Sequence, residues 1–216
     1  QAVAVEVVPS AQRFLAALPQ AFPREESRSI RRLVAKSDLD CVKTALEATN
    51  WLAPESLSTW QAENAGLAAL ALESSLGRHP ERPSYIGDDL LAVAQARSMG
   101  IPVIELERSE DSLRPYAALD DGELISWIGA MCSLQRDPQR FSEYRDGLTR
   151  AILSEGSSSS ANAKRELLRS IFHRAGFGDT PIRLVAARNA QLASSIRVSM
   201  QRAACLAVFI GHAHFA

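Results

Sequence analysis

The sequence predicts a helix-rich α/β fold in which a small central sheet carries a large helical insertion. Three short apolar runs, near residues 5, 104 and 208, have the composition of strands. Most segments between them repeat apolar residues with the period of a helix. Strands that are separated by helices favour a sheet with helices packed on its faces. An all-α protein, in which the three apolar runs are not strands, is the alternative interpretation.

The first strand is predicted over residues 2–8, where small and β-branched apolar residues predominate until Pro9. Ser10 is a suitable cap for a short helix that runs to Leu18 and ends at Pro19. The helical period predicts four further helices before the second strand. They cover residues 25–37, 39–52, 59–76 and 88–99.

The second strand is predicted over residues 102–106, because Gly100 ends the preceding helix and a short apolar run follows. Thr180 and Pro181 are typical of the first residues of a helix, so the last helix should begin there. The apolar run over residues 205–210 is the final strand. The helices between the second and third strands are predicted over residues 111–116, 120–134, 138–155, 161–174 and 180–203.

The composition is that of an ordinary globular protein. Apolar residues make up 46% of the 216 residues, which is enough for a sizeable core. A net charge of −1 gives no electrostatic reason to expect binding to nucleic acid or to an anionic membrane. The cysteines Cys41, Cys132 and Cys205 are too widely spaced for a metal motif and allow at most one disulfide. Cys205 lies inside an apolar run and is expected to be a buried thiol.

One α/β domain over residues 1–216 accounts for this length. The chain enters a strand-like run directly after Gln1 and ends directly after another. We therefore expect a domain that is truncated at both ends and belongs to a longer protein. Residues 156–160, a glycine followed by four serines, are expected to form a flexible loop within it. No apolar stretch reaches the ~20 residues that a membrane-spanning helix needs.

The most informative motif is Gly211-His-Ala-His214, which directly follows the predicted final strand. The carboxyl ends of strands in open α/β sheets are where ligands and catalytic groups gather. Neutral imidazole is the commonest metal-ligating side chain and the usual acid or base at neutral pH. His212 and His214 are therefore candidate metal ligands. An exposed turn without a chemical role is the alternative interpretation.

Three charged residues are further candidates. Glu6 lies within an apolar strand, where an ionised carboxylate needs a cation, a metal or hydrogen-bond donors, unless the strand is an edge exposed to water. Glu107 follows the second strand, and it either faces the same sheet edge or leads into the next helix. Arg188 lies beside the apolar face of the last helix, where it can grip a carboxylate as a substrate contact or as a structural salt bridge.

These pieces, taken in order, resemble the TraB/GumN family, which includes the pheromone-shutdown proteins of conjugative plasmids and TIKI-type metalloproteases. The residues that carry the resemblance are the strand with Glu6, Gly87-Asp-Asp-Leu-Leu91, Ile101-Pro-Val-Ile-Glu-Leu-Glu107, Arg188-Asn189 and Gly211-His-Ala-His214. The family pattern has two Gly-x-x-His motifs, with a glutamate soon after the first. Gly211 to His214 matches the second motif and Glu6 matches the glutamate, while the first motif is absent from these 216 residues.

The resemblance implies a metal-dependent hydrolase of the peptidase type that acts on a peptide or protein, such as a signalling peptide. It implies one divalent metal ion, with His214 and Glu6 as ligands and His212 as a further candidate. Glu6 would also act as the general base and Arg188 would stabilise the developing oxyanion. The family further suggests an exported or membrane-associated setting. The alternative is a non-catalytic protein of the same fold that binds a peptide or a partner.

Overall fold

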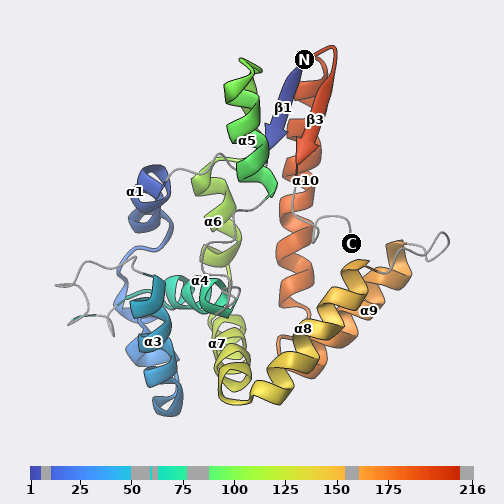
Figure 1. Cartoon of the computed structure of the whole chain (residues 1–216). Coiled ribbons are helices and arrows are strands. Elements are labelled where there is room, and N and C mark those ends of the chain that lie inside the picture. The colour runs from blue at the N-terminus through green and yellow to red at the C-terminus, as the bar shows by residue number, and fades with distance from the viewer. Residues whose placement is uncertain (6–10, 50–58, 60–62, 77–87, 154–160, 210–216) are drawn as a thin grey trace.

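A computed structural model describes residues 1–5, 11–49, 59, 63–76, 88–153 and 161–209 of the chain (Figure 1). The strands are β1 (Ala2–Val5), β2 (Val103–Glu105) and β3 (Leu206–Phe209). The α-helices are α1 (Ala11–Ala21), α2 (Ile30–Leu33), α3 (Leu39–Thr49), α4 (Ala65–Leu76), α5 (Asp88–Ser98), α6 (Ser109–Ala117), α7 (Asp121–Arg136), α8 (Pro138–Leu153), α9 (Ala161–Ala175) and α10 (Thr180–Met200). Two 3₁₀ turns, η1 (Glu26–Arg28) and η2 (Lys36–Asp38), flank α2.

The three strands form one parallel sheet in the order β2-β1-β3. Val5, at the end of β1, pairs with Glu105 of β2 and with Phe209 of β3, so the strands finish side by side at one edge. The prediction of an α/β fold with a small sheet and a large helical part is confirmed, and the all-α alternative is wrong. Within the described residues, each strand is shorter than the apolar run from which it was predicted.

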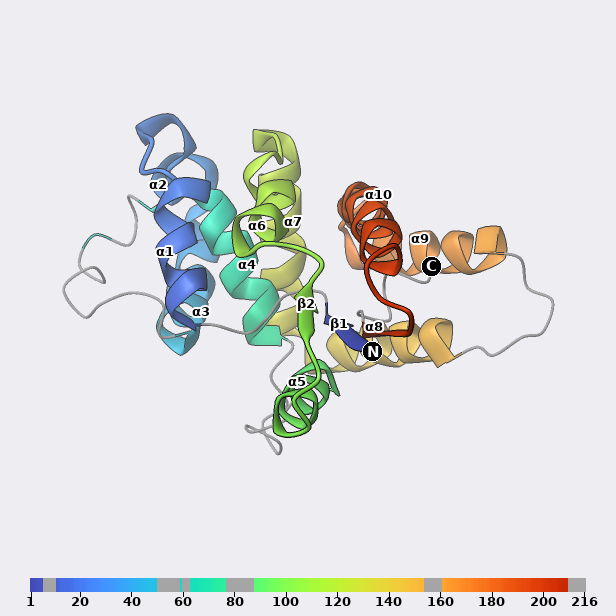
Figure 2. The same cartoon turned by 90° about the horizontal axis from the view of Figure 1, so that it is seen from above.

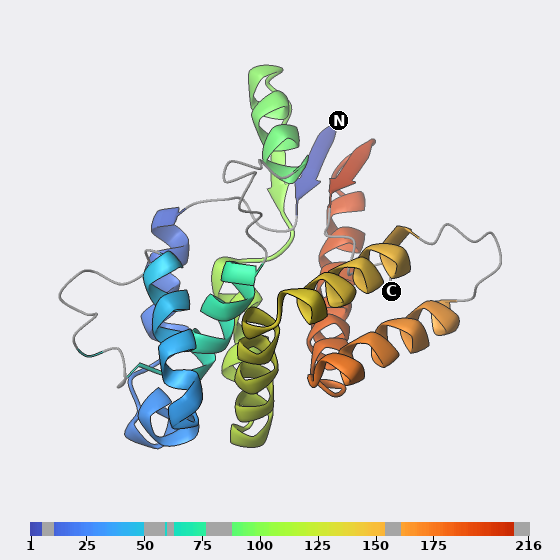
Figure 3. The ribbon, with the colours of Figure 1, turned by 60° about the horizontal axis from the view of Figure 1, so that its bottom comes forward.

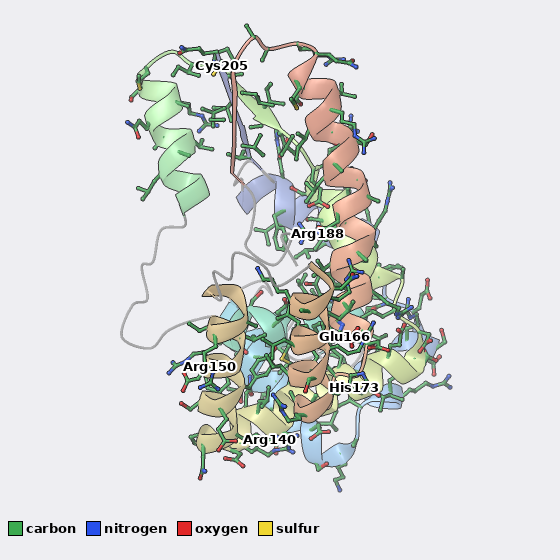
Figure 4. The ribbon with its side chains drawn as sticks, turned by 90° about the vertical axis from the view of Figure 1, so that its right-hand side faces the viewer. Arg140, Arg150, Glu166, His173, Arg188 and Cys205 are labelled. Atoms are coloured by element: carbon green, nitrogen blue, oxygen red, sulfur yellow. A yellow bond between two sulfur atoms is a disulfide. The ribbon has the colours of Figure 1, made fainter. Side chains whose placement is uncertain are left out.

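Two helices enclose the sheet, one on each face. Figure 4 shows the strands between α5 and α10, and α5 contacts all three of them. Leu192 of α10 packs against Ala4 of β1 and Leu106 directly after β2, and all three are buried. Parallel sheets are usually covered on both faces in this way, because their connections place helices there.

The remaining helices form a much larger layer beside the sheet. Figure 2 shows α1–α4, α6 and α7 gathered on one side of the molecule, with α8–α10 on the other. Trp127 and Leu124 of α7 lie in the main hydrophobic cluster with Leu72 of α4. A disulfide between Cys41 and Cys132 joins α3 to α7 in this layer, which agrees with the limit of one bridge. We call α1–α4 and α6–α9 the helical part.

Within the helical part, helices α8 and α9 form an antiparallel pair that extends away from α1–α4, α6 and α7 (Figure 3). Ile171 and Leu168 of α9 are buried with Ala151 of α8 at the contact between them. Helix α10 then runs from the base of this pair to the sheet, so it contacts both regions (Figure 1). Of the described helices, none combines the length and the apolar character that crossing a membrane requires.

Long-range contacts changed several predicted boundaries. The helix predicted over residues 25–37 is broken into η1, α2 and η2, because the Ile30 amide donates to the Glu63 carbonyl at 3.0 Å. Helix α1 continues past Pro19 to Ala21, and the burial of Leu18 and Phe22 offsets the lost backbone bond. These differences arise from contacts that the local sequence pattern does not contain.

Two further predictions were wrong at their boundaries. Helix α4 begins at Ala65 rather than at residue 59, because the Asn64 side chain accepts a hydrogen bond from the Gly66 amide at 2.8 Å and so caps the helix. Cys205 is exposed rather than buried, because it precedes β3, an edge strand of the sheet whose residues Ala207 and Val208 are exposed as well. Residues 156–160, predicted as a flexible loop, lie outside the described residues.

Candidate functional site

The site is built where the sheet meets the helical part. All three strands end at the same edge, and Glu107 follows the end of β2 by two residues. The carboxyl edge of a parallel sheet is the usual place for ligand-binding side chains in α/β proteins. Glu107 therefore lies where the sequence pattern placed it, and it is buried, with an exposed fraction of 2%.

Arg188 of α10 binds Glu107 through two atoms of its guanidinium group. Its Nε donates to Oε1 at 3.2 Å and its Nη2 donates to Oε2 at 2.5 Å. The Glu107 side chain is fully buried and that of Arg188 is 19% exposed. A buried ion pair of this kind is strongly directional, and loss of either partner leaves an uncompensated charge. The predicted inward orientation of Arg188 agrees with the structure, and its partner here is Glu107.

A second carboxylate, which is partly buried, lies close to this pair. Tyr116 of α6 donates a hydrogen bond from its hydroxyl to Oε2 of Glu73 on α4, at 2.7 Å. Burial raises the pKa of Glu73, while the hydrogen bond from Tyr116 and the charge of Arg188 act in the opposite direction. Burial and the neighbouring Glu73 carboxylate raise the pKa of the Tyr116 phenol, which therefore remains a hydrogen-bond donor.

A cavity of about 640 Å³ opens beside Glu73 and Tyr116. Helices α4 and α6–α10 supply its walls, which carry six aromatic side chains: Tyr116, Trp127, Phe141, Tyr144, Phe172 and Phe177. The ring of Phe177 lies 5.2 Å from that of Trp127 and 5.6 Å from that of Tyr144, centre to centre. Asn189, the neighbour of Arg188 in the sequence, also lines the cavity. The volume and the mostly apolar lining are typical of a small-molecule site.

The predicted metal ligands are not among the residues that the structure describes. Glu6, His212 and His214 are outside the described residues, so the metal site stays a prediction. Among the residues that the structure describes, no group of three or more His, Cys, Asp or Glu side chains could hold a metal ion. His173, on α9, is exposed, and its Nε2 lies 3.1 Å from Oδ1 of Asp179. His79 is not among the described residues.

Sequence analysis missed Glu73, Tyr116 and the cavity that they adjoin. A weak signal was present, since Glu73 interrupts the apolar run Leu67-Ala-Ala-Leu-Ala-Leu72 in α4. A lone acid at the end of such a run does not identify its partner, and Tyr116 lies 43 residues further along the chain. Only the packing of α4 against α6 brings the two side chains together.

Comparison with known proteins adds no relative, because no family model, curated protein or solved structure matches this chain. The assignment to the TraB/GumN family therefore remains a prediction that rests on the sequence motifs alone.

Proposed function

We propose that this protein is a TraB/GumN-like metal-dependent hydrolase that acts on a peptide, and that its reaction centre lies at the carboxyl edge of the sheet. The supporting observation is that Val5, Glu105 and Phe209 end side by side in parallel strands, next to the buried Arg188–Glu107 pair. An edge of this kind is where α/β enzymes gather their catalytic groups.

The sequence attaches the candidate ligands to this edge. Glu6 follows β1 by one residue, while His212 and His214 follow β3 by three and five residues. In this proposal, Glu6 and His214 converge beside the paired ends of β1 and β3, which the chain allows at a reach of up to about 3.6 Å per residue. One carboxylate and two imidazoles form a donor set that suits a divalent transition metal. Such an ion activates water and polarises a carbonyl group when it is bound.

In this proposal, the residues of the chain have distinct tasks. Glu6 takes a proton from the attacking water as the general base, and His214, with His212, holds the ion. Arg188 stabilises negative charge on the carbonyl oxygen of the substrate, and Glu107 fixes the orientation of its guanidinium group. The Cys41–Cys132 disulfide favours an oxidising compartment, in keeping with the exported setting that the resemblance suggests.

The first experiment measures thermal unfolding of this chain with and without Zn²⁺, Mn²⁺, Co²⁺ or Mg²⁺, beside the variants Glu6→Gln and His214→Ala. A metal at one hundred times its dissociation constant should stabilise the fold by about 2.7 kcal/mol, which raises Tm by about 5–10 °C. Both variants should lose this increase. The control His173→Ala removes an exposed histidine outside the proposed site and should keep it.

Failure to see stabilisation by any ion, or equal stabilisation of all four proteins, would argue against the metal site. Cleavage of peptides that requires the same ion and the same residues would then separate a hydrolase from a protein that only binds metal.

A non-catalytic protein that binds a peptide or a partner is the second candidate. The apolar cavity of about 640 Å³ favours it, because such a cavity can bind a ligand without any metal. This candidate predicts binding without turnover, unchanged in Glu6→Gln and His214→Ala.

A further inference from the structure

We propose that the cavity between α4 and α6–α10 is a binding site for a molecule that has an apolar body and one carboxylate group. The proposal goes beyond hydrolysis and does not depend on it, since it uses only side chains of the helical part and α10. Three observations carry it: the apolar walls, the position of the cationic side chains, and the single acid.

The walls determine the apolar body of the ligand. Trp127 and Phe177 are buried, with 4% and 2% of their surfaces exposed, and their rings pack against each other. Leu148, Leu168 and Val185 add aliphatic surface from α8, α9 and α10. Burial of apolar ligand surface against such walls contributes roughly 25 cal/mol per Å² before the costs of association are subtracted. A volume of about 640 Å³ accommodates a ligand of drug-like size.

The charged side chains that line the cavity determine the polar group. Among the described residues of the lining, Arg145 of α8 and Lys164 and Arg165 of α9 supply three cations, whereas Glu73 is the single carboxylate. Arg145 and Arg165 are exposed and Lys164 is half-buried, which places the cations toward solvent. Figure 3 shows that α8 and α9, the two helices that carry these cations, lie next to each other. An anionic group on the ligand is therefore complementary to this side.

Glu73 lines the cavity from α4 and is partly buried. Its carboxyl accepts a hydrogen bond from Tyr116, and burial raises its pKa. Because the carboxyl already has this partner, it does not require a cationic ligand. The arrangement thus favours a ligand that enters with its apolar end toward Trp127 and leaves its carboxylate near Lys164 and Arg165.

Two matched pairs of probes test the ligand class by isothermal titration calorimetry. Decanoate is compared with decanamide, and N-acetyl-Leu-Phe with its C-terminal amide. The carboxylate should bind about fivefold more tightly than its amide in at least one pair, a modest factor because the cations are largely exposed. Preference within the first pair indicates a fatty acid as the source, and preference within the second indicates a peptide that ends in a free carboxylate.

Two sets of variants locate the binding. Val185→Phe narrows the cavity and should weaken binding at least tenfold, whereas Leu167→Phe, a similar change at an exposed position on α9 outside the lining, should not. The double variant Lys164→Gln/Arg165→Gln should abolish the preference for the carboxylate. Its control is Arg97→Gln/Arg108→Gln, which changes two exposed cations outside the lining.

The thermal unfolding of each variant is measured as well, so that a folding defect in Val185→Phe is recognised. If Val185→Phe does not fold, the charge variants alone decide whether the ligand binds in this cavity. The proposal is overturned if no probe binds, if acids and amides bind equally, or if the Lys164/Arg165 variant keeps the preference. Because none of these measurements involves a metal or turnover, their failure is distinguishable from failure of the hydrolase proposal.

Discussion

The helical part and the sheet region differ greatly in how they are held together. The helical part has a large core in which Leu124, Ile128 and Leu72 are essentially inaccessible to solvent, and a disulfide crosses it. Among the described residues, the sheet has a small cluster on its α10 side, with the buried residues Ala4, Leu106 and Leu192. Val208 of β3 is 37% exposed.

The charged side chains of the candidate site, Arg188 and Glu107, lie at the junction of these two regions rather than in either core. Arg188 belongs to α10, which contacts β3 as well as α6 and α9, and Glu107 lies two residues after the end of β2. Their ion pair therefore joins the weakly packed region to the well-packed one.

The largest effect is expected when the junction is broken. Arg188→Met leaves the buried Glu107 carboxylate without its partner, and should lower the free energy of unfolding by about 3–5 kcal/mol. Urea denaturation measures the change. Arg183→Met is the control on the same helix, because Arg183 pairs with Glu123 while 60% of its side chain is exposed, and it should cost less than about 1 kcal/mol.

The double variant Glu107→Leu/Arg188→Met removes both charges at once and should recover most of the lost stability, because no buried charge then lacks a partner. If the double variant is as unstable as Arg188→Met alone, the ion pair is not the origin of the effect.

Removal of the disulfide should have the next largest effect. Cys41→Ala/Cys132→Ala opens a covalent link between residues that are 91 positions apart, and should cost about 2–4 kcal/mol, largely through the greater freedom of the unfolded chain. Cys205→Ala, at an exposed free cysteine, should leave stability within about 0.5 kcal/mol of the parent. Equal effects in the two variants would contradict the assignment of the covalent link to α3 and α7.

The smallest effect concerns pH and Glu73. Because burial raises the folded-state pKa of Glu73 above its ordinary value of 4.5, folding favours the protonated acid. The stabilising contribution is complete below that ordinary value and is lost as pH rises through the folded-state pKa. The variant Glu73→Gln stays neutral. As pH rises above about 4.5, its free energy of unfolding should therefore increase relative to that of the parent.

Unfolding curves at a series of pH values measure this difference. Glu143→Gln, at an exposed position on α8 outside the cavity lining, serves as the control and should follow the parent. A constant difference between Glu73→Gln and the parent at all pH values would show that Glu73 has the same pKa in the folded and unfolded chains.

Local patterns predicted what depends on local chemistry. The strands were found because apolar runs around Ala4, Ile104 and Val208 are bounded by polar or turn-forming residues. The inward face of α10 followed from the helical period, which also placed Arg188 beside the core. The sequence did not predict the break at Ile30 or the Tyr116–Glu73 bond, because each depends on a partner that folding brings from a distant segment.

The cavity was unpredictable for the same reason, since six helices must pack before it exists. The family resemblance, and with it the metal site, stays a prediction: Glu6, His212 and His214 fall outside the described residues, and the motifs that name the family are short. Arg188 is the member of that predicted set whose surroundings are described.

The central position of β1 has a consequence for the synthesis of the protein. Val3 is made before both of its neighbours in the sheet, which are Val103 and Ala207. On a ribosome, the helices can form as they emerge, because their backbone hydrogen bonds are local, whereas β1 must wait for β3. During that interval the apolar residues of β1 are unpaired, so a chaperone that shields this segment should increase the yield of folded protein.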